Sequence, residues 1–223
     1  AAFAQSSGLN SGIGTGGSGP IKVVYADFGE DQEMAELYKI VLDEAGYKAS
    51  TQAVNTRELY LPLLKDNKVQ VVPDYAASLT TALYQGATKK TDNGPVGTDI
   101  ATTLAGLKKY AADANLVPGT PSTATDVNAF AVTQGTAQKY NLKTLSDFAA
   151  KCSGKASSLA GPAECPTRPF CQLGLQQTYN ITFGNFVNMG TDAGGPVTKK
   201  ALTDGKATLG LVFSSDPTVQ PAG

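Results

Sequence analysis

The stretch VQVVPDYAASLTTAL, Val69–Leu83, decides the fold that we expect for this chain. Its first residues form a short apolar run rich in valine, which is typical of a buried strand. Pro73 ends that run, and after Asp74 and Tyr75 small and hydroxyl-bearing residues begin a segment with the pattern of a helix. We therefore expect a strand followed directly by a helix, with Tyr75 at the junction.

Two earlier segments repeat this alternation of strand and helix. Residues 21–28 (IKVVYADF) and 47–54 (YKASTQAV) have the pattern of strands, and a helical pattern follows each of them. The apolar side of the first helix is expected to consist of Met34, Leu37, Tyr38, Val41 and Ala45. That of the second consists of Leu59, Leu63 and Leu64. Asn55 and Glu58 have the spacing of a capping box at the start of the second helix.

Three strands separated by helices favour parallel pairing through right-handed crossovers. In parallel sheets, ligands bind at the carboxyl ends of the strands. Asp27 and Phe28 end the first strand, and Tyr75 and Ser78 follow the third, so we expect an aromatic and polar edge there. The alternative is that Tyr75 only closes the rim of the core, with its hydroxyl in water.

A second set of elements follows a helix expected at residues 97–115 and a passage rich in Pro, Gly and Thr. Its first strand is predicted at Asn128–Val132, and a returning strand is predicted within residues 207–216. Helices are predicted at Thr144–Lys151, Leu173–Tyr179 and Val197–Leu202.

This order predicts an α/β protein of two lobes, with chain crossings near residues 120 and 213. Lobe I is expected to comprise residues 21–118 with 214–223, and lobe II residues 119–213. A cleft between two such lobes is the natural place for a ligand. Residues 1–20 are rich in Gly and Ser and are expected to form a flexible tether. Their G-x-G-x-x-G pattern follows no strand, which argues against a dinucleotide site.

Composition excludes several classes of function. The sequence has no histidine, which removes the commonest general base and the commonest zinc ligand. The net charge of −1 and the scattered basic residues do not favour nucleic acid or an anionic membrane. No window approaches the roughly 20 apolar residues of a membrane-spanning helix. We expect no cofactor, no metal site and no catalytic residues.

Cys152, Cys165 and Cys171 lie within one segment of 20 residues and match no spacing typical of a metal site. We expect one disulfide among them, in a loop-rich segment and in an oxidising compartment. The sequence does not decide which two pair, and three free thiols are the alternative.

Several motifs together resemble the substrate-binding proteins of glycine betaine, carnitine and choline ABC importers, of the ProX/OpuC type. The opening stretch YADFGEDQEMAELY is similar to theirs, NTRELYLPLL resembles their GSREVLYPAL-like helix, and DYAAS resembles their EYTGT motif. Further on, NAFAV resembles NTYAL, GPAECPTR resembles GPPEF..R, and VFSSD resembles AYTTD. The resemblance spans residues 21–217 in the same order and implies the two-lobed clamp of type II periplasmic binding proteins.

The resemblance also implies a site in which aromatic rings surround a trimethylammonium head and a basic group binds the carboxylate of the ligand. Tyr75 matches a cage tyrosine, and Ser78 matches the hydroxyl three residues later. Phe130 and Phe213 match two further cage positions, and Arg168 matches the arginine for the carboxylate. The alternative for each phenylalanine is a place in the core, and for Arg168 a place on the surface. Asp27 and Phe28 complete the predicted ligand-binding residues through their position at the strand end.

Three departures from the family pattern concern the ligand. Ala26 stands where related proteins often have a lysine, and phenylalanine replaces tyrosine at 130 and 213, which makes the site more apolar. Family members also continue well beyond the VFSSD motif to complete the first lobe and supply a fourth aromatic residue, so lobe I is expected to be incomplete in this chain.

The expected function is that of an extracytoplasmic receptor that binds a small quaternary ammonium osmolyte and delivers it to a membrane permease. We expect a monomer that is lipid-anchored in its full-length precursor. An alternative is the same fold with a more aromatic ligand, such as a polyphenol. An enzyme is less favoured, because only carboxylates such as Asp27, Asp31 and Asp74 are available for acid–base chemistry, and carboxylates at helix starts are more often caps.

Overall fold

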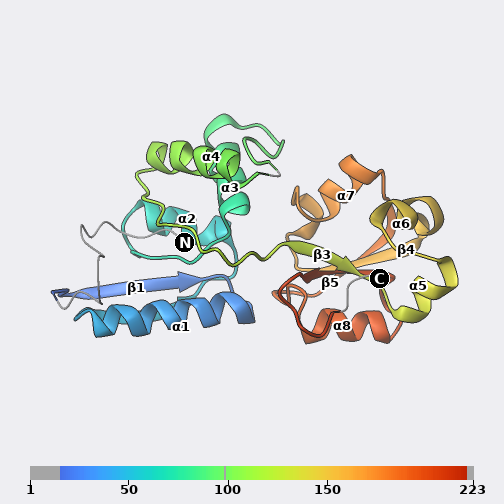
Figure 1. The fold of residues 1–223 in the computed structure, drawn as a ribbon, viewed down its shortest axis with the longest axis horizontal. Coiled ribbons are helices and arrows are strands. Elements are labelled where there is room, and N and C mark those ends of the chain that lie inside the picture. The colour runs from blue at the N-terminus through green and yellow to red at the C-terminus, as the bar shows by residue number, and fades with distance from the viewer. Residues whose placement is uncertain (1–15, 98, 220–223) are drawn as a thin grey trace. The chain divides into compact units, whose positions relative to one another are not determined.

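The structure, a computed structural model, describes residues 16–97 and 99–219. The chain divides between Thr123 and Ala124 into two units, which we call unit 1 and unit 2 (Figure 1). The elements of unit 1 are β1 (Pro20–Tyr25), α1 (Gly29–Glu44), β2 (Lys48–Ala53), α2 (Arg57–Lys65), α3 (Ala76–Thr88) and α4 (Ile100–Asp113). Those of unit 2 are β3 (Asn128–Ala131), α5 (Gln134–Tyr140), α6 (Leu145–Cys152), β4 (Gly154–Gly161), η1 (Cys165–Thr167), α7 (Gln172–Tyr179), β5 (Phe183–Asn188), α8 (Pro196–Thr203) and β6 (Leu209–Phe213). The predicted alternation of helices and strands is confirmed.

The sheet of unit 1 is parallel, as predicted. β1 pairs with β2 along its whole length, and on the other side of β1 the predicted third strand is reduced to an isolated parallel bridge between Val23 and Val71. The amide of Val24 donates to the carbonyl of Val71 at 2.9 Å. Pro73 has no N–H to donate, so the pairing cannot continue past it.

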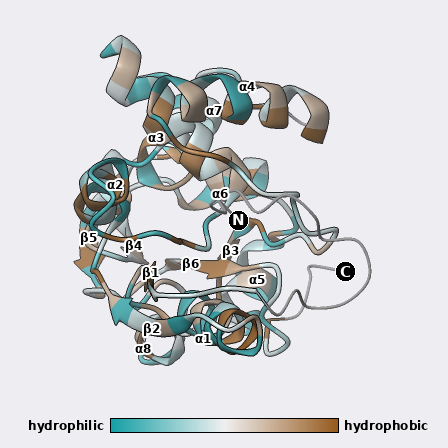
Figure 2. Ribbon diagram, turned by 90° about the vertical axis from the view of Figure 1, so that its left-hand side faces the viewer, coloured by the Kyte–Doolittle hydropathy of each residue, from teal (hydrophilic) through white to brown (hydrophobic). Residues whose placement is uncertain are grey.

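Helices cover both sides of this sheet, with α1 on one side and α2 and α3 on the other (Figure 1). The larger core lies on the α2 and α3 side and includes Tyr60, Leu64, Val72, Leu79, Leu83 and Leu107. The smaller core, on the α1 side, consists of Val23, Ala35 and Val71. In Figure 2, α1 and α4 each show teal and brown segments, so both helices contain hydrophilic and hydrophobic residues.

The predicted buried face of α1 is wrong for three of its residues, whereas Tyr38 packs against the core as predicted. Met34, Leu37 and Val41 are exposed, with 37%, 57% and 50% of their surface accessible. The helix instead packs through Asp31, Ala35, Tyr38 and Leu42. The spacing of both sets is helical, and small Ala35 brings the helix close to the sheet, so the periodic pattern alone did not identify the buried side.

The predicted capping box of α2 is also wrong. The N-cap residue is Thr56, one residue after Asn55, and no side chain caps the helix there. A side-chain cap of this kind occurs in α6, where Thr144 and Asp147 form a capping box.

Unit 2 is built on a four-stranded sheet in the order β3-β6-β4-β5, in which β6, β4 and β5 are parallel and β3 is antiparallel to β6. Helices α6 and α7 lie on one side of it and α8 on the other (Figure 1). The core on the α6 and α7 side includes Phe148, Leu159, Leu175, Ile181, Leu209 and Leu211. The sequence patterns did not predict α5, β4 or β5.

The expectation of a loop-rich segment between the cysteines is wrong in its first half. β4 lies there, and its last three residues, Leu159 to Gly161, are buried. The second half is irregular and contains the disulfide Cys165–Cys171, so the predicted disulfide is present. Cys152, at the end of α6, is half-buried and free.

Residues 214–219 lie with unit 2. The hydroxyl of Ser214 and the amide of Ser215 both donate to Asp126, just before β3. Lys199 of α8 forms an ion pair with Asp216 at 2.6 Å, and this hydrogen bond lowers the pKa of Asp216 to about 2. Within the described residues, no helix is both long enough and apolar enough to cross a membrane.

Candidate functional site

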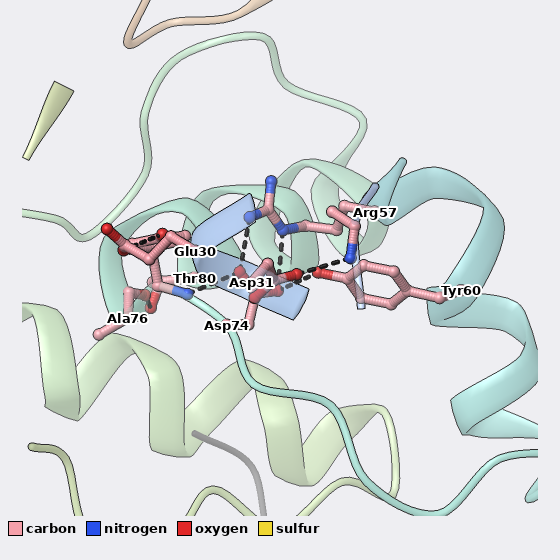
Figure 3. Close-up of polar contacts among 9 residues, drawn as sticks. Glu30, Asp31, Arg57, Tyr60, Asp74, Ala76 and Thr80 are labelled. Atoms are coloured by element: carbon pink, nitrogen blue, oxygen red, sulfur yellow. Dashed lines mark hydrogen bonds and ion pairs between the residues drawn. The ribbon is translucent and has the colours of Figure 1, made fainter. Parts of the chain in front are cut away.

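The carboxyl edge of the unit 1 sheet gathers six side chains that carry charge or aromatic rings. They come from the connection after β1, from the first turn of α1, from the start of α2, and from the segment before α3. These side chains are those of Phe28, Glu30, Asp31, Arg57, Asp74 and Tyr75. Figure 3 shows the polar contacts around Asp74 at this edge.

Tyr75 is the N-cap residue of α3 and is half-buried, outside the core clusters. Its ring is stacked on that of Phe28, with ring centroids 6.4 Å apart and an angle of 21° between the planes. Its hydroxyl donates a hydrogen bond to Oε1 of Glu30 at 2.5 Å. Tyr75 therefore lies at the sheet edge, as predicted, with its ring beside a second ring and its hydroxyl on a carboxylate.

The buried carboxylate of Asp74 holds Tyr75 and its neighbours in place through hydrogen bonds. Its side chain is 1% exposed and accepts hydrogen bonds from Nε of Arg57 at 2.9 Å and from Nη2 at 2.6 Å. It also accepts from the hydroxyl of Tyr60 at 2.5 Å and from the backbone N–H of Tyr75 at 2.7 Å. A buried carboxylate with a bidentate arginine and two further donors has its charge compensated.

The same contacts shift the pKa values of the two partners of Asp74. Burial raises the pKa of Tyr60 well above its ordinary value, and the negative charge of Asp74 raises it further. For Arg57, burial lowers the pKa, but the charge of Asp74 and its hydrogen bond, together with the charges of Tyr60 and Glu58, outweigh this effect and raise the pKa above its ordinary value.

Asp31 is the second buried carboxyl group of this edge, 5% exposed in the first turn of α1. It accepts a hydrogen bond from the backbone N–H of Ala26 at 2.6 Å. Burial raises its pKa to about 7, the bond from Ala26 opposes the shift, and the charge of Asp74 adds to it. Asp31 therefore closes the turn between β1 and α1, which explains its position better than a catalytic role does.

The remaining predicted residues of unit 1 are more peripheral. Ser78 lies in the first turn of α3, three residues after Tyr75, and is half-buried. Asp27 is exposed on the connection between β1 and α1. The structure thus brings Phe28 and Tyr75 into contact, and places Ser78 one turn away.

In unit 2, Phe130 and Phe213 lie on the same face of the sheet. In the antiparallel register, Phe130 is opposite Leu211 and Phe213 is opposite Asn128, so the two rings occupy diagonal positions. Phe130 packs against the core on the α6 and α7 side. Phe213 is the last residue of β6 and is half-buried at the carboxyl edge. The alternative that these phenylalanines belong to the core therefore fits Phe130 better than Phe213.

Arg168 lies inside the disulfide loop at that edge, directly after η1. Its backbone N–H donates to the carbonyl of Cys165 at 3.2 Å, and its carbonyl accepts from the N–H of Cys171 at 3.0 Å. The side-chain amide of Asn128 donates to the carbonyl of Phe170 at 2.9 Å, which connects the loop to the start of β3. Gly174 has no side chain, as the loop requires, because a Cβ there would lie 1.8 Å from the carbonyl oxygen of Pro169.

Sequence reasoning missed three residues of the unit 1 edge as parts of the site: Glu30, Arg57 and Tyr60. Arg57 and Tyr60 lie in the stretch NTRELYLPLL, whose pattern predicted a helix and a family resemblance but no site residue. For Glu30, the signal available in the sequence was its position at the start of a predicted helix, two residues after Phe28.

A separate shallow hollow of about 420 Å³ lies between α6 and α7 in unit 2. Its lining consists of Ser146, Ala149, Ala150, Thr178, Tyr179 and Asn180. None of these side chains is charged, and none is a predicted ligand-binding residue. Within the described ranges, no three His, Cys, Asp or Glu side chains are grouped so that they could hold a metal ion.

Comparison with protein families gives one match that covers most of the chain. The OpuAC model, described as the substrate binding domain of ABC-type glycine betaine transport system, matches residues 19–222. No curated protein sequence matches at a significant level.

Three solved structures share the fold at low sequence identity. A glycine betaine/carnitine/choline ABC transporter protein is 19% identical, with a TM-score of 0.58 over 88% of this chain and 69% of the other. Apo YehZ from Escherichia coli is 17% identical, with a TM-score of 0.52 over 88% and 70%. The glycine betaine/L-proline-binding protein ProX from Borrelia burgdorferi is 12% identical, with a TM-score of 0.54 over 89% and 64%. The fold is that of type II periplasmic binding proteins.

Proposed function

Because the chain belongs to the OpuAC family, the substrate-binding domains of ABC-type glycine betaine transport systems, we propose that its ligand is a small quaternary ammonium osmolyte. Glycine betaine, carnitine and choline are the candidates. Family membership makes the chain an extracytoplasmic solute-binding component of an ABC importer. The ligand and the residues that bind it are the proposal.

The observation that carries this proposal is the ring pair of Phe28 and Tyr75 at the carboxyl edge of the unit 1 sheet. A quaternary ammonium group cannot donate hydrogen bonds, so ring faces and dispersion have to hold it. Each well-placed ring contributes about 0.5–2 kcal/mol. Two hydrogen bonds hold Tyr75 in place: its backbone N–H donates to Asp74, and its hydroxyl donates to Glu30. Such a ring loses little freedom when a ligand binds.

Unit 2 is proposed to contribute the remaining contacts. Arg168 would bind the carboxylate of a betaine or carnitine, because the guanidinium group matches a carboxylate in two parallel hydrogen bonds. Phe213 lies at the same edge of the sheet as the disulfide loop that carries Arg168, and Phe130 lies two residues from the start of β3. We propose that both units are needed for binding, and that the protein acts as a monomer, lipid-anchored in its precursor, that delivers its ligand to a permease.

A second ligand class, aromatic or polyphenolic, is favoured by one observation. Phe130 and Phe213 lack the hydroxyl groups that tyrosine would supply, so the unit 2 face is more apolar than it would be with tyrosine at both positions. The two ligand classes differ in charge, and therefore one experiment separates them.

The experiment is a thermal-shift panel of glycine betaine, carnitine, choline, common amino acids and plant phenolics, followed by calorimetry of the hits. A ligand that binds only the folded state at 100 times its Kd stabilises it by about 2.7 kcal/mol, which is a clear shift in Tm. A shift with the quaternary ammonium compounds supports the proposal. A shift with the phenolics alone would replace it with the second ligand class, and small-angle scattering with the bound hit would show whether closure accompanies binding.

A further inference from the structure

The connection between β1 and α1 closes on a buried carboxyl group. Asp31 lies in the first turn of α1 and is 5% exposed. Its Oδ2 accepts the backbone N–H of Ala26, the first residue after β1, at 2.6 Å. Between these two residues the chain turns through Asp27 and Phe28, and the N–H of Phe28 donates to the carbonyl of Ala26 at 2.7 Å. Asp31 therefore holds the turn that places the ring of Phe28 against that of Tyr75.

The side chain of Asp31 has little to balance a negative charge. Among the residues that the structure describes, it forms no ion pair, and the bond from Ala26 is its only side-chain hydrogen bond. Asp74, at the same edge, is also buried but accepts two hydrogen bonds from the guanidinium of Arg57. A buried carboxylate without such a partner is costly, so the position of Asp31 favours the protonated acid.

Four charged or titratable groups act on Asp31 from the elements around it (Figure 3). Glu30 precedes it in α1, and Asp74 lies in the segment before α3. Arg57 and Tyr60 belong to α2. Burial is the largest effect and raises the pKa of Asp31 to about 7, the backbone hydrogen bond and Arg57 oppose the shift, and the two acidic neighbours add to it. Asp31 therefore changes between its neutral and charged forms near neutral pH.

We propose that Asp31 is a pH switch for the ring pair of Phe28 and Tyr75: the neutral acid keeps the turn closed and the rings stacked, and the carboxylate opens it. The arrangement with Asp31 buried is that of the neutral acid. An ionised Asp31 gains free energy by moving toward water, and this movement gives up the bond from Ala26 and displaces Phe28. The effect on a ligand rests on the function proposed above, whereas the movement of the ring needs no ligand.

The direction of the effect separates this switch from simple charge attraction. If ionised Asp31 acted only through its charge, a cationic ligand would bind more tightly as the pH rises. An opened turn does the opposite: affinity is complete below pH 7 and is lost as the pH rises above it, because only the protonated fraction is competent to bind. By linkage, binding near pH 7 should also take up protons.

The first test follows the ring without a ligand. 4-Fluorophenylalanine is incorporated at position 28 of the full chain, and its fluorine NMR signal is recorded from about pH 5 to about pH 9. We expect a transition with a midpoint near pH 7, accompanied by a larger solvent isotope shift at high pH because the ring becomes more exposed. Asp31→Asn keeps an oxygen that accepts the N–H of Ala26 but cannot ionise, so it should show no transition. Glu33→Gln removes an exposed carboxylate from the same helix and should behave as wild type.

The second test measures the affinity of the same proteins for choline by calorimetry. Choline is a suitable probe because its quaternary nitrogen carries the same charge at every pH. We expect binding to wild type and to Glu33→Gln to be about tenfold weaker at about pH 8.5 than at about pH 5.5. Asp31→Asn should bind equally at both values. Buffers of different ionisation enthalpy report the proton uptake of wild type near pH 7, which the variant should lack.

Two kinds of result would overturn the inference. A fluorine signal without a transition, or with one that persists in Asp31→Asn, would show that Asp31 does not control the ring. Choline affinity that stays constant, rises with pH, or falls equally in Asp31→Asn would show that ionisation of this residue does not open the site. If choline, glycine betaine and carnitine all fail to bind wild type at about pH 5.5, the proposed function fails, and the fluorine titration still decides whether the switch exists.

Discussion

Arg57 holds Asp74 in two parallel hydrogen bonds, at 2.9 and 2.6 Å, and Asp74 in turn accepts the backbone N–H of Tyr75. The start of α2 is thereby tied to the start of α3 across the carboxyl edge of the unit 1 sheet. The ion pair is almost fully buried, so its geometry leaves Tyr75 little freedom to move.

Breaking this ion pair should destabilise the protein strongly. In Asp74→Asn the guanidinium of Arg57 stays buried without its counter-charge, and we expect a loss of about 3–5 kcal/mol in the free energy of unfolding. Urea denaturation measures it. Asp66→Asn is the matched control, because Asp66 is exposed in its ion pair with Lys68 and should change stability by less than about 1 kcal/mol. Equal effects of the two changes would contradict this account.

Tyr75→Ala should lower ligand affinity by about 1–3 kcal/mol, because both the ring contact area and the cation–π contribution are lost. Since Tyr75 lies outside the core clusters, stability should fall by less than about 1.5 kcal/mol. Leu79→Ala, in the same helix but 3% exposed, should do the reverse and cost about 2–5 kcal/mol of stability with affinity nearly intact. Calorimetry and urea denaturation of both variants decide whether Tyr75 forms a wall of the ligand site or closes the rim of the core.

The Tyr75→Phe variant separates the ring from its hydroxyl. Retained affinity in Phe with lost affinity in Ala would show that the ring face holds the ligand. Equal losses in both would assign the contribution to the hydroxyl, and unchanged affinity in both would remove Tyr75 from the site.

Asp31 should make stability depend on pH. Its pKa in the folded protein is about 7, above the ordinary 3.8, so the folded state keeps a proton that the unfolded state loses. Its contribution is complete below about pH 4 and is lost as the pH rises to about 7, a total of about 4 kcal/mol. Asp31→Asn keeps an acceptor for the amide of Ala26 but has no proton to lose. The difference in unfolding free energy between the variant and wild type should therefore move in favour of the variant between pH 4 and pH 7 and stay constant above it. A difference that does not change with pH would contradict the raised pKa.

Arg168→Gln should discriminate between ligands with and without a carboxylate. Loss of a charged hydrogen-bonding partner costs about 1.5–3 kcal/mol for a bound carboxylate. We expect glycine betaine and carnitine to lose affinity by this amount, while choline, which has no carboxylate, is nearly unaffected. Calorimetric titrations of the three ligands measure the effect, and a uniform loss for all of them would show that Arg168 acts on structure and not on the carboxylate.

Removing the disulfide should loosen the loop that carries Arg168. Closing so short a loop stabilises by about 2–3 kcal/mol, so the double change Cys165→Ala and Cys171→Ala should lower the unfolding free energy by about that amount. Cys152→Ala is the control, because removing this free thiol should lower the unfolding free energy by less than about 1 kcal/mol. Because Arg168 lies between the two bonded cysteines, betaine affinity should fall more than choline affinity, and equal losses would argue against this coupling.

Sequence patterns predicted the elements with strong periodicity and missed those without it. The apolar runs of β1 and β6 and the parallel arrangement of unit 1 were identified correctly. β4 was missed because its sequence, GKASSLAG, consists mostly of small residues, without the β-branched and aromatic side chains typical of strands. The third strand was shortened by Pro73. The face of α1 was partly misassigned because the exposed apolar residues and the residues that pack on the sheet both have helical spacing.

The candidate site could be predicted only in part for a similar reason. Strand ends mark the edge of a sheet, so Phe28 and Tyr75 were identified from their positions. The contacts that hold them, from Arg57 to Asp74 and from Tyr75 to Glu30, join segments 17 and 45 residues apart in the chain. A local sequence pattern cannot predict such contacts, because they depend on how the first turns of α1, α2 and α3 are placed at the carboxyl edge of the sheet.

The strand order of unit 2 has a consequence for how the chain acquires its structure. β6 is the last strand in the sequence but lies inside the sheet, between β3 and β4, and its residue Phe213 is opposite Asn128, 85 positions earlier. Until β6 is inserted, β3 has no neighbour in the sheet and the core side chains of β4 lack part of their cover. Pairing at such sequence separation is slow, because the loop has to close before the contacts stabilise it. Unit 2 therefore cannot complete its sheet until the chain has been synthesised through β6.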